Sequence, residues 1–309
     1  MSIDLSTNLG ALQLAAPTLT ASGCAAAGRE LAQFGDVATL GAVVTKSIML
    51  NARSGRPTPR MAETPSGMLN SIGLQGPGIE QFIEKDLAWL TEHGVTTVVS
   101  IAGGTVAEFG ELAGRLNGEP GIAALEVNIS CPNVESRGQV FACNHDSASE
   151  VIRTVRSQWT NSAPILAKLT PDVTDIVSIA QSVVEAGADG LSMINTLLGM
   201  VIDVDAMRPM LGGKTGGLSG PAIRPVAVRA VYQVHAALPD TPILGMGGIR
   251  TGRDALEFLA AGASAVSIGT VVFGDPSAPW RIARELGEEL ETRGYRSVRE
   301  VIGKAHQAG

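Results

Sequence analysis

Pro242-Ile-Leu-Gly-Met246, the helical pattern over residues 252–261, and Ala265-Val-Ser-Ile268 together decide the fold class. Two short apolar segments on either side of a run with apolar positions three and four apart are typical of a strand, a helix and a second strand. The helix carries the chain back across the sheet, so the two strands lie parallel. Residues 242–268 therefore predict a parallel sheet covered by helices.

The same alternation recurs along the whole chain, and several helical patterns end in glycine, as at Gly94, Gly187 and Gly262. Eight strands separated by helices predict a (β/α)8 TIM barrel, which at 309 residues forms one domain, residues 1–309. The expected strands are residues 17–21, 42–45, 97–101, 124–127, 165–169, 190–194, 242–246 and 265–268, and the expected helices include residues 78–93, 105–116, 147–159, 174–185, 223–237 and 252–261.

Three segments, residues 47–76, 132–146 and 197–221, are too long for simple connections between a strand and a helix. Long loops in a compact domain usually have a function, so we expect these to extend over the active site. The alternatives are surface decoration and contacts between subunits.

The composition excludes several classes of protein. A net charge of −7 and an aromatic content of 4% argue against nucleic-acid binding. No apolar run approaches the ~20 residues that span a bilayer, and residues 1–10 lack a basic leader, so we expect no membrane contact and a cytoplasmic location. Three cysteines without CxxC spacing predict neither a disulfide framework nor a metal or iron–sulfur site.

Polar residues and glycines follow the predicted strands. In a barrel, the C-terminal ends of the strands meet at one face, which carries the active site. A ring of lysines, asparagines and glycines at that face predicts one functional pocket. These strand ends are Ser22-Gly23, Lys46, Ala102-Gly103-Gly104, Asn128, Lys168, Asn195-Thr196, Gly247-Gly248 and Gly269-Thr270.

The glycines after the last two strands, in Gly245-Met-Gly-Gly-Ile-Arg250 and Ser267-Ile-Gly-Thr270, indicate a phosphate site. Glycine turns expose backbone N–H groups to a phosphate of a substrate or of flavin mononucleotide (FMN). Two ordinary turns are the alternative. The segment Leu211-Gly-Gly-Lys-Thr-Gly-Gly217 is not a nucleotide P-loop, because the earlier glycine of that motif is replaced by Arg208.

The segment Asn128-Ile-Ser-Cys-Pro-Asn133 places two amides and a thiol directly after a strand. An amide offers both a donor and an acceptor, which suits a planar ring with carbonyl and N–H groups. A thiol near lysines can serve as a base once it is deprotonated. A buried structural cysteine beside a turn is the alternative.

These residues carry a resemblance to dihydroorotate dehydrogenases of class 1, and most closely to the 1B subclass. The similarity covers about residues 20–275, with departures at residues 101–105 and 134–143. The matching segments are Thr45-Lys46, Pro57-Thr-Pro-Arg60, Glu63-Thr-Pro-Ser-Gly-Met-Leu-Asn70, Ile72-Gly-Leu74, Asn128-Ile-Ser-Cys-Pro-Asn133, Lys168-Leu-Thr-Pro171, Asn195-Thr-Leu-Leu-Gly-Met200, Gly216-Gly-Leu-Ser-Gly-Pro221 and the two glycine turns.

The resemblance implies an FMN-dependent oxidation of dihydroorotate to orotate in pyrimidine biosynthesis, with Cys131 as the catalytic base. It implies that the substrate is bound by Lys46, Asn70, Gly73, Leu74, Asn128, Asn133, Asn195 and Thr196. It implies that FMN is bound by Ser22, Lys46, Asn128, Lys168, Gly220, Gly247, Gly248, Gly269 and Thr270.

The resemblance also implies a partner subunit that carries FAD and an iron–sulfur cluster and reduces NAD, around a homodimer of this chain. Three alternatives stay open from the residues alone. They are an FMN barrel acting on another dihydropyrimidine or an enone, a flavin-free barrel that binds a phosphorylated substrate, and a subunit without catalytic activity.

Overall fold

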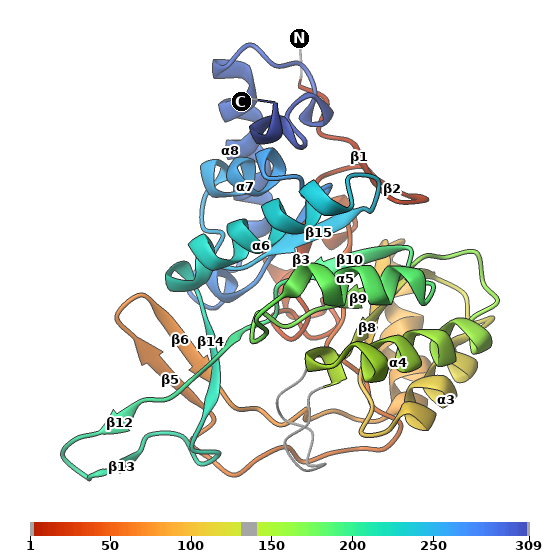
Figure 1. Ribbon diagram of the computed structural model, residues 1–309, viewed down its shortest axis with the longest axis vertical. Helices are drawn as coiled ribbons and strands as arrows, with labels where there is room; N and C mark the ends of the chain where they lie inside the picture. Colours follow the sequence, from red (N-terminus) through yellow and green to blue (C-terminus); the bar gives the residue numbers. More distant parts are fainter. Residues whose placement is uncertain (1–2, 131–140, 308–309) are drawn as a thin grey trace.

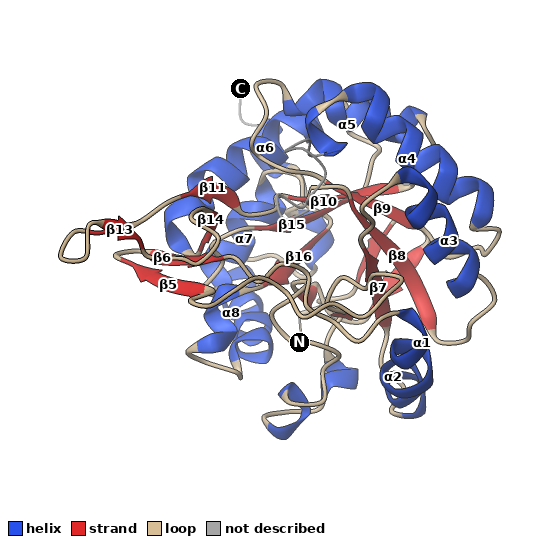
Figure 2. Cartoon of the chain, turned by 90° about the horizontal axis from the view of Figure 1, so that it is seen from below, coloured by secondary structure: helices blue, strands red, loops and turns tan. Residues whose placement is uncertain are grey.

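The computed structural model describes residues 3–130 and 141–307 and has a closed barrel at its centre (Figures 1 and 2). Its eight parallel strands are ordered β3-β16-β15-β10-β9-β8-β7-β4. A parallel bridge between Leu19 and Ala42 joins β3 to β4 and closes the ring. The predicted (β/α)8 barrel is confirmed.

All eight predicted strands are present, with ends that differ by at most two residues from the expected ones. The largest difference is at β8, which begins at Ile122 and ends at Asn128. The strands are β3 (Thr18–Thr20), β4 (Val43–Val44), β7 (Thr97–Ile101), β8 (Ile122–Asn128), β9 (Ile165–Lys168), β10 (Gly190–Met193), β15 (Ile243–Met246) and β16 (Ala265–Ile268).

Helices surround the barrel, as Figure 2 shows. The segment expected as one helix over residues 78–93 has a π-helical stretch, Phe82–Leu87, between its two α-helical ends. Helix α8 was missed in the sequence, although its buried Ile282, Leu286 and Leu290 recur at a spacing of four residues. The helices are α1 (Ile79–Gln81), α2 (Ala88–Glu92), α3 (Val106–Leu116), α4 (His145–Gln158), α5 (Ile176–Glu185), α6 (Arg224–Ala237), α7 (Gly252–Ala260) and α8 (Ala278–Thr292).

Two of the three expected long loops contain strands of their own, which the sequence analysis did not predict. Four of these strands form an antiparallel sheet in the order β11-β14-β6-β5, which we call the wall sheet. The third loop, residues 132–146, is described only from residue 141 onward. The additional strands are β1 (Thr7–Leu9), β2 (Leu12–Leu14), β5 (Met61–Thr64), β6 (Gly67–Asn70), β11 (Leu197–Gly199), β12 (Ile202–Asp203), β13 (Arg208–Pro209) and β14 (Gly216–Ser219).

The interior of the barrel changes from apolar to polar along the strands. Val98, Ala124 and Leu166 belong to the apolar cluster inside the barrel. Successive residues of a strand point to opposite sides, so the residue two positions further along also points inward. On β7, β8 and β9 these residues are Ser100, Glu126 and Lys168, all of them buried. The barrel therefore has an apolar base and a polar layer toward its C-terminal end.

Helices long and apolar enough to cross a bilayer do not occur in the described residues.

Candidate active site

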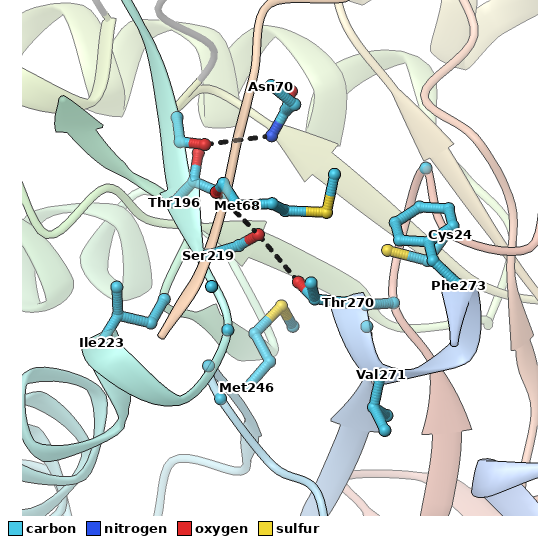
Figure 3. A pocket seen from close by; sticks show the side chains of 18 of the residues that line it. Cys24, Met68, Asn70, Thr196, Ser219, Ile223, Met246, Thr270, Val271 and Phe273 are labelled. Carbon is cyan, nitrogen blue, oxygen red and sulfur yellow. Dashed lines mark hydrogen bonds between the residues drawn. The ribbon is translucent and has the colours of Figure 1, made fainter. Parts of the chain in front are cut away.

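A cavity of about 1290 Å³ lies at the C-terminal ends of the barrel strands. Figure 3 shows residues from the wall sheet and from the ends of β15 and β16 facing one another across it. Cys131 and Asn133, predicted as base and substrate ligand, lie outside the described residues. Every other predicted site residue lines the cavity, namely Ser22, Lys46, Asn70, Gly73, Leu74, Asn128, Lys168, Asn195, Thr196, Gly220, Gly247, Gly248, Gly269 and Thr270.

One predicted part of the pocket is absent from its lining. Ala102, Gly103 and Gly104, which follow β7, are not cavity residues. Gly103 instead lies against helix α3, where a Cβ atom would come within 3.0 Å of the Phe109 ring. The expectation that this strand end joins the pocket was wrong.

A buried hydroxyl fixes two amides, one on the last residue of β8 and one shortly after β10. The Nδ2 group of Asn195 donates to the Ser130 Oγ atom at 2.8 Å, and this hydroxyl donates to the Asn128 Oδ1 atom at 2.9 Å. Asn128 in turn donates from Nδ2 to the Ser47 Oγ atom at 3.1 Å. Ser130 is 1% exposed and Ser47 is 2% exposed, so water does not compete for these bonds. The amides are held in defined orientations.

An ion pair lies beneath the cavity, between Glu126 on β8 and Lys168 on β9. The Lys168 Nζ atom is 3.4 Å from the Glu126 Oε1 atom, and the side chains are 5% and 0% exposed. The Ser100 hydroxyl donates to the same carboxylate oxygen at 2.9 Å. The second oxygen, Oε2, has no hydrogen-bond partner in the described part of the chain. A buried carboxylate is costly unless it is paired, so Lys168 and Glu126 are held together.

The opposite end of the cavity is formed by glycine turns. Gly247 and Gly248 have φ angles of 133° and 80°, which side chains rarely adopt. A Cβ atom at Gly248 would lie 2.6 Å from the Gly220 carbonyl oxygen, so the two backbones approach closely. Arg224 and Arg250 line the cavity as well. Glycine turns, whose backbone N–H groups no side chain covers, suit a phosphate, whereas the Arg224 guanidinium is paired with Asp254 and Glu257.

The wall sheet is bonded directly to the barrel end. The Thr270 hydroxyl, after β16, donates to the Ser219 Oγ atom at 2.8 Å, and Ser219 bonds the Met68 carbonyl oxygen at 3.5 Å (Figure 3). The Asn70 Nδ2 group donates to the Gly217 carbonyl oxygen at 3.3 Å. This network fixes the distance between the glycine turns and the substrate side of the cavity.

Cys24 also lines the cavity, but burial makes it a poor base. Burial raises the pKa of its thiol to about 11, against the opposing effect of the positive charges of Lys168 and Lys46. A thiol with this pKa stays protonated at neutral pH. Cys24 is therefore excluded as a base at this pH.

The cavity residues fit a flavin nucleotide. Glycine turns at one end offer backbone N–H groups to a phosphate, and a buried lysine at the other offers a cation to the polar edge of a ring. The fixed amides of Asn128 and Asn195 offer donors and acceptors to a second planar molecule. Fold and cavity together define a barrel enzyme with a phosphate-bearing cofactor and a polar planar substrate.

Comparison with known proteins agrees with this class. The family model for dihydroorotate dehydrogenase matches residues 4–290, and the chain belongs to this family. The chain is 50% identical to the dihydroorotate dehydrogenase B (NAD(+)) catalytic subunit of Desulforudis audaxviator (strain MP104C), over all of both chains. It is 48% identical to the subunit of the same name from Geobacter sp. (strain M21), over 97% of each chain. It is 47% identical to that of Geobacillus kaustophilus (strain HTA426), over 99% of this chain and 96% of the relative.

The predicted resemblance to class 1B and the predicted enzyme class, an oxidoreductase that dehydrogenates dihydroorotate, are thereby confirmed. Enzymes of this family depend on a flavin. Four residues that shape the site, Ser47, Ser100, Glu126 and Ser130, were not predicted individually. Ser130 lies inside the motif that was singled out, so its position in the turn could have indicated its role.

Proposed function

We propose that this chain is a single-domain, FMN-containing catalytic subunit over residues 1–309, which oxidises dihydroorotate to orotate in pyrimidine biosynthesis. The observation that supports it most is the convergence of the amides, the buried lysine and the glycine turns on one cavity, in a chain of this family. FMN, which carries a single phosphate at the end of its chain, suits the glycine turns after β15 and β16.

The binding roles follow from the chemistry of the lining. The substrate carries a carboxylate and a ring with alternating carbonyl and N–H groups, which lysine and asparagine side chains can bind. Its proposed ligands are Lys46, Asn70, Gly73, Leu74, Asn128, Asn133, Asn195 and Thr196, and those of FMN are Ser22, Lys46, Asn128, Lys168, Gly220, Gly247, Gly248, Gly269 and Thr270.

The proposed reaction divides the two hydrogens of the substrate between a protein base and the cofactor. Cys131 removes the proton from C5 through its thiolate. Bound FMN supplies the acceptor for the hydride that leaves C6. Lys168 would hold a positive charge near the polar edge of a bound flavin ring and would stabilise negative charge that develops there. The substrate's position is fixed by Asn128 and Asn195, which Ser130 orients.

We propose that the electrons continue to NAD through a second subunit with FAD and an iron–sulfur cluster. The relatives' names, which contain "NAD(+)" and "catalytic subunit", support a partner. A homodimer of this chain would form the core of a heterotetramer. Its assembly is supported by exposed apolar side chains on the arm of residues 197–210, which projects from the barrel in Figure 1. They are Leu198, Met200, Ile202, Val204, Met207 and Met210.

Anaerobic titration of the purified protein tests this function. Addition of dihydroorotate should bleach the flavin absorbance stoichiometrically and yield orotate. The flavin released on denaturation should be FMN by chromatography. A colourless protein, or a flavin that dihydroorotate does not reduce, would contradict the proposal.

A further inference from the structure

A continuous hydrogen-bonded chain connects the substrate side of the cavity to the ion pair beneath it. It begins with the Asn195, Ser130, Asn128 and Ser47 bonds described above. It continues from the Ser47 Oγ atom to the Ser100 Oγ atom at 2.9 Å, and from there to the Glu126 carboxylate. Lys168 bonds the same carboxylate oxygen as Ser100. The described residues thus connect five strand ends, those of β10, β8, β4, β7 and β9.

The donor-to-acceptor direction of these hydrogen bonds is fixed by the groups at the two ends of the series. An amide NH₂ group only donates and a carboxylate only accepts, whereas a serine hydroxyl donates one hydrogen. Ser100 uses its hydrogen on Glu126, so in the bond between Ser47 and Ser100 the donor is Ser47. Ser22 lies 3.1 Å from the Ser47 Oγ atom and 3.4 Å from the Ser100 Oγ atom, and it can only donate to either, because both of those serines use their own hydrogens. All donors point toward Glu126.

We propose that Glu126 is a positioning residue that couples the substrate site to the cofactor site, an inference that rests on the proposed function. Its charge holds the Lys168 ammonium group at the cavity wall, where it would face the polar edge of a bound flavin. Its role as terminal acceptor fixes the serine hydroxyls and, through them, the amides of Asn128 and Asn195. Glu126 itself does not line the cavity, so it acts through these residues rather than on the substrate.

Two substitutions separate the effect of the Glu126 charge from the effect of the hydrogen bonds that run through Ser100. Glu126→Gln removes the negative charge beside Lys168 but keeps an oxygen that Ser100 can bond. Ser100→Ala keeps the ion pair but deprives the Ser47 hydroxyl of its acceptor, so the group that accepts from Asn128 Nδ2 is no longer held in one orientation. Two ligands serve as probes. Sulfite adds to oxidised flavin, and its affinity rises with positive charge near the ring. Orotate perturbs the flavin absorbance when it binds.

We expect Glu126→Gln to tighten sulfite binding about tenfold at pH 6.5, because the Lys168 charge is no longer compensated. The same substitution in a Lys168→Gln background should change sulfite affinity less than twofold. Ser100→Ala should leave sulfite affinity within twofold of the unsubstituted protein and weaken orotate about tenfold, the usual effect of one lost buried hydrogen bond. Circular dichroism and FMN content establish that each variant is folded.

The outcomes distinguish this inference from the proposed function. If the unsubstituted protein lacks a flavin that dihydroorotate reduces, the proposed function fails. If that flavin is reduced but Glu126→Gln leaves sulfite affinity unchanged, or changes it equally without Lys168, the charge role is overturned. Unchanged orotate affinity in Ser100→Ala overturns the coupling, and this variant stays informative even if Glu126→Gln does not fold.

Discussion

At the scale of single residues, the surroundings of a thiol decide whether it is deprotonated and can act as a base. Cys24 lies in the cavity, but burial raises the pKa of its thiol to about 11. It is therefore protonated at the pH of catalysis and cannot remove a proton from the substrate. The role of base falls to Cys131 in the proposed mechanism, and Cys24 offers a matched comparison.

Cys131→Ala should retain FMN but reduce the rate of flavin reduction by dihydroorotate by a factor of ~10²–10⁴, the usual contribution of a general base. Cys24→Ala should retain most of the rate. Stopped-flow absorbance under anaerobic conditions measures both. Equal rates in the two variants would remove Cys131 from the mechanism.

A second residue, His235, makes stability depend on pH. Burial lowers the pKa of this imidazole, and the neighbouring His306 lowers it further. The ring lies against the backbone, because a Cβ atom at Gly262 would come within 2.2 Å of it. As the pH falls, the unfolded chain takes up the proton first. The contribution of neutral His235 to the free energy of unfolding is thus complete above the unfolded-state pKa of ~6.5. It is lost as the pH falls through the lower folded-state pKa.

We expect the melting temperature to fall between pH 7.5 and pH 5 by a smaller amount in His235→Gln than in the unsubstituted protein. His93→Gln, at an exposed ring stacked on Trp89, is the control for the loss of an imidazole at the surface. Differential scanning calorimetry at both pH values measures the difference. Identical pH dependence in all three proteins would exclude His235 as the cause.

At the scale of elements, the wall sheet depends on a close contact between two backbones. A Cβ atom at Gly67, where β6 begins, would lie 1.9 Å from the Ser219 carbonyl oxygen of β14. Ser219 also accepts the hydrogen bond from Thr270 on the barrel. A side chain at Gly67 therefore separates β6 from β14 and disturbs the link to the glycine turns.

Gly67→Ala should destabilise the protein, since overpacking typically costs ~1–3 kcal/mol of folding stability, and the displacement of β6 from β14 should weaken orotate binding. Gly76→Ala is the control, because a Cβ atom there meets nothing within 4 Å. Titration of the flavin absorbance with orotate gives both affinities. Equal affinities would mean that the wall sheet can shift without affecting the substrate site.

The elements also show what the sequence could and could not predict. Barrel strands were predictable because each is a local apolar run, and in a barrel their ends must converge. The wall sheet was not predictable, because β6 and β14 pair residues such as Leu69 and Leu218, which are far apart in the chain. Glu126 was missed for a related reason. A charged residue within an apolar strand normally indicates an exposed face, and only the barrel closure makes that face internal.

At the scale of the whole molecule, the proposed electron path has to leave this chain. The sequence has no dinucleotide fingerprint and too few cysteines for an iron–sulfur cluster. Dihydroorotate should therefore reduce the flavin of the isolated chain without reducing NAD. Addition of the partner subunit should restore NADH formation, followed by absorbance at the NADH band. Rapid NAD reduction by the isolated chain would contradict the proposed division between subunits.

The wall sheet and the ion pair have one more property in common, which concerns how the chain can be divided. In both, one member comes from the first half of the barrel and the other from the second: β6 pairs with β14, and Glu126 with Lys168. A chain cut between β8 and β9 would thus yield two fragments, each with one partner of both of these contacts. Flavin should bind to neither fragment alone and should return only when both are refolded together, so the yellow colour would report that the two halves have reassociated.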